Sequence, residues 1–352
     1  MKGLLIIVYT IISWYLSTVT FIIPLYLLSG IKPLRKTCLG LSKFIVGLNM
    51  SNSSYFYRKI LNLPIYFYGD KISKNDTGLF FMNHRSSVDH LFFISLLSEI
   101  ADPSQIKIVM KSMLRFFPGL GHVCYINDFP FLKRNFSTDQ NYLKNVGKTL
   151  KDSNVLIFPE GTRFTDKKLI DSNIYSQKNG YPQYKNVLLP KTKGSYLIMK
   201  SMLENKTLDY VYDLTIDFEG IEKGKQYNVS SFIFKNNAKA IHIHCRKIPI
   251  SNIPLDENLF RKWMHDLYLA KDFLLSTPSE RWKNVYKPLK VNKKENKVIF
   301  YLILILTICF IYLLIQEKKF RYYHLVLFVI GTIIVSYNSK YKNISKLKEI
   351  NC

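Results

Sequence analysis

The sequence predicts a mixed α/β domain, with a central sheet flanked by helices, held between an N-terminal membrane segment and a C-terminal transmembrane hairpin. Three observations predict this architecture. Strand-like apolar runs alternate with helical patterns between residues 60 and 280, as in layered α/β domains. Residues 3–31 contain no charged residue. Two further uncharged runs, 298–315 and 322–339, lie near the other end of the chain.

The N-terminal run is long enough to cross a bilayer core of about 30 Å at about 1.5 Å per helical residue. It is too long for the apolar part of a signal peptide, and no small-x-small cleavage site follows it. Whether it crosses the bilayer or lies within one leaflet, kinked at Pro24, stays open. Residues 298–315 and 322–339 predict a membrane hairpin, and a pair of buried core helices is the alternative.

The formal net charge of +25 predicts a negatively charged binding partner. Nucleic acid is the usual partner of a basic protein, but the aromatic residues here lie in the apolar runs rather than among the lysines. We therefore expect no nucleic-acid partner and instead a bilayer, whose anionic head groups attract basic surface. Lys32, Arg35, Lys36 and Lys43 follow the first apolar run, and only Lys2 precedes it. The positive-inside rule then places the central domain in the cytosol.

The expected organisation has five parts along the chain. They are an anchor with its basic juxtamembrane segment (1–54), a cytosolic domain (55–282), a basic linker (283–297), the hairpin (298–339) and a basic tail (340–352). Within the domain, strands are expected at 63–69, 78–83, 105–110, 123–127, 154–160, 209–218 and 240–246. Helices are expected at 87–99, 111–117, 139–151, 193–204 and 257–275, with a polar loop at 164–186.

The stretch NHRSSVDH, residues 83–90, places an imidazole and a carboxylate five positions apart where a strand meets a helix. Ser86 as N-cap and Asp89 three residues later form a capping pattern, so a purely structural role for Asp89 stays open. That role leaves His84 unexplained. A turn before the cap can bring the His84 ring beside Asp89, which would fix the tautomer and leave the other nitrogen to accept a proton from a hydroxyl. Such a base would activate a substrate alcohol for acyl transfer.

The stretch NVLIFPEGTR, residues 154–163, ends a second buried strand in polar residues. Gly161 permits tight backbone geometry, and Arg163 offers a planar fork suited to phosphate oxygens. An ordinary turn, with Arg163 paired to a surface acid, is the alternative. Because ligands of open α/β sheets collect at strand ends, the two stretches make most sense as one site. His242 and His244 are expected to be ordinary strand histidines, and no metal site is expected.

The two stretches resemble the H-x4-D and P-E-G-T-R motifs of the glycerophospholipid acyltransferase family. FLKRN (131–135) resembles the intermediate basic motif of that family, and LLPKTKG (188–194) resembles its fourth motif, all in the family's order. The C-terminal hairpin resembles one eukaryotic branch. That branch contains 1-acylglycerol-3-phosphate, lysocardiolipin and lysophosphatidylinositol acyltransferases.

The resemblance implies the fold of the glycerolipid acyltransferases and acyl transfer from acyl-CoA, a co-substrate, to the free hydroxyl of a lysophospholipid. It implies no separate cofactor. The first expected acceptor is 1-acyl-glycerol-3-phosphate, which gives phosphatidic acid. Remodelling of lysocardiolipin or lysophosphatidylinositol is the alternative, and an inactive lipid-binding membrane scaffold is a more distant one.

The resemblance also implies the residue roles. His84 is the general base and Asp89 orients it, while phosphate binding falls to Glu160, Gly161, Thr162 and Arg163, with Arg163 the principal contact, and to Arg134 and Lys193. Lys191 stands where the branch commonly has an arginine, which leaves its role open. The expected residence is the endoplasmic reticulum membrane, as a multi-pass protein with a cytosolic catalytic domain. The mitochondrial outer membrane is the alternative.

Overall fold

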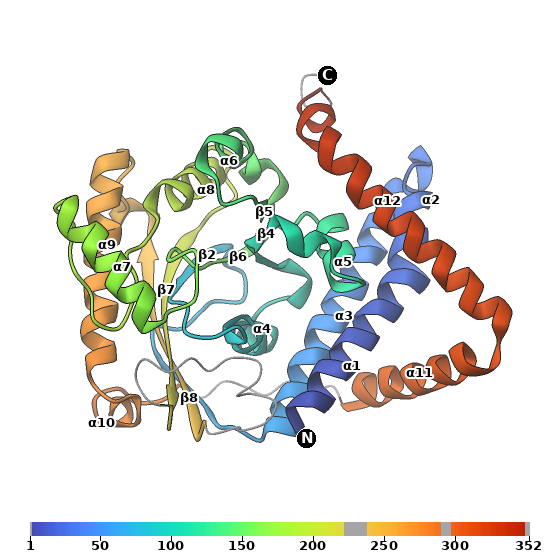
Figure 1. Cartoon of the computed structure of the whole chain (residues 1–352), viewed down its shortest axis with the longest axis horizontal. Coiled ribbons are helices and arrows are strands. Elements are labelled where there is room, and N and C mark those ends of the chain that lie inside the picture. Colours follow the sequence, from blue (N-terminus) through green and yellow to red (C-terminus); the bar gives the residue numbers. More distant parts are fainter. Residues whose placement is uncertain (1, 222–237, 290–296, 349–352) are drawn as a thin grey trace.

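The computed structural model describes residues 2–221, 238–289 and 297–348, and Figure 1 shows a sheet-containing domain beside a layer of long helices. The N-terminal helix α1 (Lys2–Ser17) continues through a π-helical turn (Thr18–Ile22) into α2 (Ile23–Leu28). The chain then returns along α3 (Arg35–Leu61). The expected boundary after residue 54 therefore falls inside a helix.

The central sheet has six strands in the order β1-β8-β7-β2-β6-β3, and only the β7–β8 pair is antiparallel. The strands are β1 (Ile65–Gly69), β2 (Gly78–Met82), β3 (Ile106–Ile108), β6 (Asn154–Ile157), β7 (Tyr210–Glu219) and β8 (Ala240–Pro249). A separate parallel pair joins β4 (Met110–Lys111) to β5 (Phe131–Leu132). Because β2 and β6 are parallel neighbours, their carboxyl ends lie at the same edge of the sheet.

The sheet separates two apolar cores, and β2 supplies both because successive side chains of a strand point to opposite faces. Phe80 and Met82 belong to the core that contains α4 (Asp89–Ile100), α5 (Leu120–Ile126) and the N-terminal helices. Leu79 and Phe81 belong to the other core, which is covered by α8 (Thr192–Glu204) and α9 (Glu257–Ser276). The remaining helices of the domain are α6 (Phe136–Leu143), α7 (Asp166–Lys178) and α10 (Trp282–Val285).

A polar seam joins α1 to α3 beside the first core. The Trp14 indole donates to Ser53 Oγ (3.1 Å), and Ser17 Oγ donates to Asn49 Oδ1 (3.1 Å). Bonds of this kind satisfy polar groups that packing has removed from water, so the N-terminal helix is fixed to the domain along its length.

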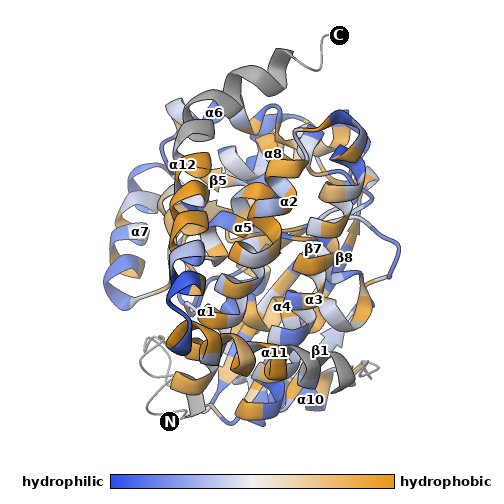
Figure 2. Cartoon of the chain, turned by 90° about the vertical axis from the view of Figure 1, so that its right-hand side faces the viewer, coloured by the Kyte–Doolittle hydropathy of each residue, from blue (hydrophilic) through white to orange (hydrophobic). Residues whose placement is uncertain are grey.

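Two helical segments in the described part of the chain are long and apolar enough to cross a membrane, Ile7–Leu28 and Lys318–Ser336. The second belongs to α12 (Lys318–Lys348), which follows α11 (Lys297–Gln316) and extends beyond the expected end of the hairpin at residue 339. The described apolar part of α11, Leu304–Gln316, is shorter than a span. Figure 2 shows hydrophobic residues along α11 and α12, whereas α7 is mostly hydrophilic. These segments indicate association with a membrane.

Two predictions of local structure are wrong. Residues 123–126 of the strand expected at 123–127 belong to the helix α5, and Asn127 is its C-cap. The segment packs against the N-terminal helix, and tertiary burial overrides local propensity. Gly119, at φ 72°, turns the chain into α5, and a Cβ there would lie 2.6 Å from the Tyr15 backbone. The polar residues 164–186, expected as a loop, contain α7, whose first turn is capped by the Thr165 hydroxyl accepting from the Lys168 amide (3.2 Å).

Two helix predictions differ in extent. Residues 111–117 form a 3₁₀ turn at Ser112–Phe116, and the expected helix over 139–151 is α6 followed by a 3₁₀ turn at Val146–Thr149. The start of the helix at the first predicted motif also differs: Val88, not Ser86, is the N-cap of α4.

Candidate active site

The register of β2 and β6 places the two predicted motifs side by side at one edge of the sheet. Phe81 pairs with Ile157, an offset of 157 − 81 = 76 residues, and the same offset, 160 − 84 = 76, separates His84 from Glu160. Both residues lie just past the carboxyl ends of their strands. The number of residues between the two motifs therefore equals the sequence offset between paired residues of β2 and β6.

The backbone of His84 is held on both sides by the second motif. Glu160 Oε1 accepts from the His84 amide (2.9 Å), and the Phe164 amide donates to the His84 carbonyl (2.7 Å). Glu160 Oε2 accepts from the Leu188 amide (3.3 Å). The Glu160 side chain is buried, and burial raises the pKa of its carboxyl to about 8.

The His84 and Asp89 side chains form a hydrogen-bonded pair. His84 Nδ1 lies 2.9 Å from Asp89 Oδ2, which also accepts from the Ser86 amide (2.8 Å). Asp89 is fully buried; burial raises the pKa of its carboxyl, and the bond from His84 opposes that rise. With Nδ1–H donated to the carboxylate, His84 Nε2 is left as a proton acceptor. The His84 ring stacks on Phe158, with ring centroids 4.1 Å apart, so its orientation is fixed from a second side.

His84 lines a cavity of about 690 Å³ at this edge of the sheet. Apolar side chains from several elements line part of it: Val109, Met110, Leu132, Leu143, Ile157 and Ile198. The N-terminal turn of α8 also lines it, with Lys191, Thr192, Lys193 and Gly194. The cavity therefore combines an apolar surface that suits a lipid chain with backbone amides and cations that suit an anion.

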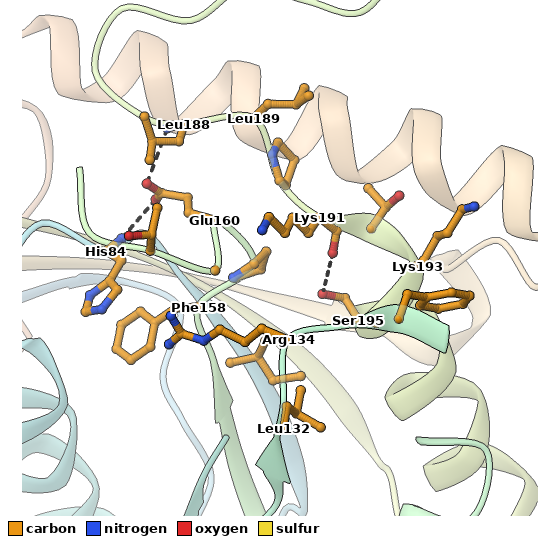
Figure 3. A pocket seen from close by; sticks show the side chains of 18 of the residues that line it. His84, Leu132, Arg134, Phe158, Glu160, Leu188, Leu189, Lys191, Lys193 and Ser195 are labelled. Atoms are coloured by element: carbon orange, nitrogen blue, oxygen red, sulfur yellow. Dashed lines mark hydrogen bonds between the residues drawn. The ribbon is translucent and has the colours of Figure 1, made fainter. Parts of the chain in front are cut away.

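Four of the cations that line the cavity are Arg134, Lys168, Lys191 and Lys193. Figure 3 shows the Arg134 guanidinium extending toward Phe158 and His84. Arg134 adopts φ 64°, and its loop is held by the buried Asp139 carboxylate, which accepts from the amides of Lys133 (3.0 Å) and Arg134 (2.8 Å). Asp139 thus directs a cation into the cavity.

Lys168 supplies a cation from α7. Its amine donates to Thr162 Oγ1 (2.6 Å) and to the Arg163 carbonyl (3.1 Å). Burial, followed by the positive charges of Arg163 and Arg134, lowers the pKa of Lys168. An anion bound among these groups would relieve their mutual repulsion.

The structure brings most of the predicted site residues together. His84, Arg134, Glu160, Gly161, Thr162 and Lys193 all line the cavity, and Asp89 lies behind His84. Arg163, expected as the principal phosphate contact, is not among the residues that line it and is half-buried beside the cavity. Its positive charge lies near Lys168 and, after burial, is one of the causes that lower the pKa of that amine.

Sequence reasoning missed Lys168 and Phe158. Lys168 lies on a helix that was expected as a loop, and Phe158 was treated as part of a buried strand. The pattern T-D-K-K at 165–168, a capping threonine before a charged first turn, was the signal for α7.

The two strand histidines lie apart from this cavity. His242 is buried between the Tyr68 hydroxyl (2.9 Å from Nδ1) and Glu219 Oε2 (3.0 Å from Nε2). No group of three or more potential metal ligands occurs within the described ranges.

Comparison with known proteins identifies the family of this chain. The model of the family described as acyltransferase matches residues 64–216, and a model described as acyltransferase C-terminus matches residues 232–306. A protein of Arabidopsis thaliana named "Probable 1-acyl-sn-glycerol-3-phosphate acyltransferase 5" is 30% identical over 74% of this chain and 68% of its own length. The chain belongs to the acyltransferase family.

Other relatives carry different acceptors in their names. Lysophosphatidylinositol acyltransferase 10 of Caenorhabditis elegans is 30% identical over 67% of this chain, and lysocardiolipin acyltransferase 1 of Mus musculus is 27% identical over 62%. The matched region spans 58% of the length of each of these two proteins. The crystal structure of the 1-acyl-sn-glycerophosphate acyltransferase PlsC from Thermotoga maritima matches 79% of this chain and 100% of its own, with 15% identity and a TM-score of 0.44.

Proposed function

We propose that the protein transfers an acyl group from acyl-CoA to the free hydroxyl of a lysophospholipid. The observation that carries this proposal is that His84, hydrogen-bonded to Asp89, lines one cavity together with a cluster of cations and an apolar surface. A base that acts on an alcohol, a group of cations that binds a phosphate and an apolar surface that receives a chain are the three requirements of this reaction.

The proposed reaction needs no protein nucleophile. His84 Nε2 takes the proton of the acceptor hydroxyl as its oxygen attacks the thioester carbonyl of acyl-CoA. The resulting tetrahedral intermediate collapses with cleavage of the carbon–sulfur bond, and the proton on Nε2 passes to the leaving thiolate. Asp89 stabilises the imidazolium between these two steps.

Arg134, Lys168 and Lys193 are proposed to bind the phosphate of the lysophospholipid. Arg163, beside the cavity, would add positive charge near Lys168. The remaining predicted residues have positioning roles in this proposal. Gly161 provides a left-handed turn (φ 67°) beside the Lys191 side chain, Thr162 holds Lys168, and Glu160 positions His84.

The acceptors named for the relatives share the groups that these residues recognise. The expected 1-acyl-glycerol-3-phosphate, like the alternatives lysophosphatidylinositol and lysocardiolipin, has a free hydroxyl, an acyl chain and a phosphate. We propose the endoplasmic reticulum membrane as the residence, with the catalytic domain facing the cytosol, where acyl-CoA is available. The mitochondrial outer membrane is the second candidate.

The test is acyl transfer by microsomes that contain the full chain or its His84→Ala variant. We expect the variant to fall to background activity while its amount in the membrane fraction stays unchanged. Equal turnover by the variant would contradict the proposed base, and absence of transfer by the wild-type chain to every lysophospholipid would favour the inactive scaffold. Arg134→Gln should raise the KM for the acceptor more than Arg163→Gln does, because Arg134 lines the cavity.

A further inference from the structure

The cavity has a second wall, formed by α7 and α9, that the reaction does not require. It consists of Asp171 and Tyr175 from α7, Tyr181 from the turn that follows, and Glu257, Arg261 and His265 from α9. The two helices stand together at the left of Figure 1. Residues four apart on a helix share a face, and so both helices present one polar and aromatic face to the cavity. We call this group the α7–α9 wall.

Aromatic groups lie at the centre of the wall. Tyr181 makes an edge contact with His265 (ring centroids 5.0 Å apart) and lies 6.4 Å from Tyr175. The Arg261 guanidinium lies over the Tyr181 ring at 5.8 Å. Burial and the charge of Arg261 lower the pKa of His265, which favours the neutral imidazole, a ring that can both donate and accept a hydrogen bond.

Two carboxylates flank these rings. Asp171 and Glu257 are both exposed to the open cavity. Among the residues that the structure describes, no hydrogen bond or ion pair engages either side chain. The wall therefore offers two negatively charged hydrogen-bond acceptors, one cation (Arg261) and the faces of aromatic rings.

This charge balance decides which chemistry fits the wall. A phosphate placed next to either carboxylate would be repelled by its like charge. The nucleotide of acyl-CoA, or a second phosphate of the acceptor, would meet Asp171 and Glu257. Hydroxyl groups donate hydrogen bonds to carboxylates, and the C–H faces of a polyol pack on aromatic rings. The wall thus suits a neutral, hydroxyl-rich group.

The wall also lies within reach of the cation cluster. Lys168, Asp171 and Tyr175 share one face of α7, and at about 1.5 Å per residue Asp171 lies about 4.5 Å and Tyr175 about 10.5 Å beyond Lys168 along the helix. A head group esterified to a phosphate at Lys168 would extend along this face.

From this arrangement we propose that the α7–α9 wall binds a polyol head group, of the inositol or glycerol type, esterified to the phosphate of the acceptor. The proposal rests on the proposed function, in which the cavity holds a lysophospholipid. It implies that 1-acyl-glycerol-3-phosphate, which has no head group, leaves the wall empty and is a poorer acceptor.

The test uses microsomes containing the full chain and one acyl-CoA, with four acceptors: 1-acyl-glycerol-3-phosphate, lysophosphatidylinositol, lysophosphatidylglycerol and lysocardiolipin. We expect kcat/KM for lysophosphatidylinositol or lysophosphatidylglycerol to exceed that for 1-acyl-glycerol-3-phosphate by about tenfold or more, as expected for a hydrogen-bonded specificity group. Asp171→Asn and Glu257→Gln should each lower that ratio by about tenfold. Asp166→Asn and Asp266→Asn, which alter acids of the same two helices outside the cavity lining, should leave it unchanged.

Each other outcome overturns the proposal in a recognisable way. If 1-acyl-glycerol-3-phosphate is the best acceptor and the wall variants leave the ratio unaltered, the wall binds no head group, although the acyltransferase function stands. A rise in the KM for acyl-CoA with every acceptor would assign the wall to the donor. Preference for lysocardiolipin that is lost in Arg261→Gln would assign it to a second phosphate. Loss of transfer to all four acceptors in the wild type would contradict the proposed function itself.

Discussion

Replacing Asp89 by asparagine tests how the carboxylate supports the proposed base. Both hydrogen bonds at Asp89 end on the same oxygen, Oδ2, while Oδ1 has no hydrogen-bond partner among the described residues. An asparagine whose oxygen takes the place of Oδ2 would keep the bonds from His84 Nδ1 and the Ser86 amide. Asp89→Asn should therefore preserve the ring's orientation and tautomer and remove only the negative charge.

The loss of that charge sets the expected magnitude. At a charge separation of about 4 Å and an effective dielectric constant near 20, the carboxylate stabilises the imidazolium by about 4 kcal/mol. Removing it should lower kcat/KM by about 10³-fold, since about 1.4 kcal/mol corresponds to a factor of ten. Folding stability should change little, because burial already disfavours the charged form of Asp89.

The assay is the initial rate of CoA thiol release at saturating lysophospholipid over a range of concentrations of one acyl-CoA, which gives kcat/KM for the donor, with the melting temperature measured in the same detergent. Asp76→Asn is the matched control, because this carboxylate accepts from the Tyr212 hydroxyl (2.6 Å) and Lys247 (2.6 Å) away from the cavity. More than a tenth of wild-type kcat/KM in Asp89→Asn would refute the charge argument. A similar loss in Asp76→Asn would show that the assay reports folding rather than catalysis.

Three further predictions concern the same edge of the sheet. Gly161→Ala should lower the melting temperature by about 2–8 °C and raise the KM for the lysophospholipid, because φ 67° disfavours a side chain and the new Cβ would lie 3.2 Å from Lys191 Cδ. Because the folded-state pKa of Glu160 is raised to about 8, the folded protein binds more protons than the unfolded chain between about pH 4.5 and 8, so stability should fall as pH rises through this window. Glu160→Gln should flatten that dependence in thermal melts recorded across the window, and an unchanged slope would contradict it. Lys271→Met should destabilise the fold by about 3 kcal/mol, measured as a lower melting temperature, because the buried Lys271 amine pairs with Asp213 and donates to the Phe81 carbonyl (3.2 Å).

The sequence was sufficient to predict how the two motifs meet. Each motif follows an apolar run, and parallel neighbouring strands bring their carboxyl ends together. A capping role for Asp89 and its pairing with His84 are compatible, because one carboxylate oxygen accepts from the Ser86 amide and pairs with the His84 ring.

The direction of the basic side chains could not be predicted in the same way. Arg163 and Arg134 both lie in loops, where side-chain direction depends on individual backbone angles rather than on a repeating period. The left-handed conformation of Arg134 (φ 64°), fixed by the Asp139 carboxylate, turns that guanidinium into the cavity. Nothing in the local sequence FLKRN specifies this sign of φ, because it results from a contact with a residue of the next helix.

The backbone bonds of His84 change the physical meaning of the second motif. The Glu160 side chain is buried, so it is poorly placed to contact a phosphate directly. Its two oxygens instead accept from the amides of His84 and Leu188, and the Phe164 amide closes the other side of His84. The position of the base therefore depends on a loop that also carries Gly161, Thr162 and the partners of Lys168. If a phosphate binds as proposed, movement of that loop would shift the His84 backbone, so that phosphate binding and the position of the proposed base would be coupled.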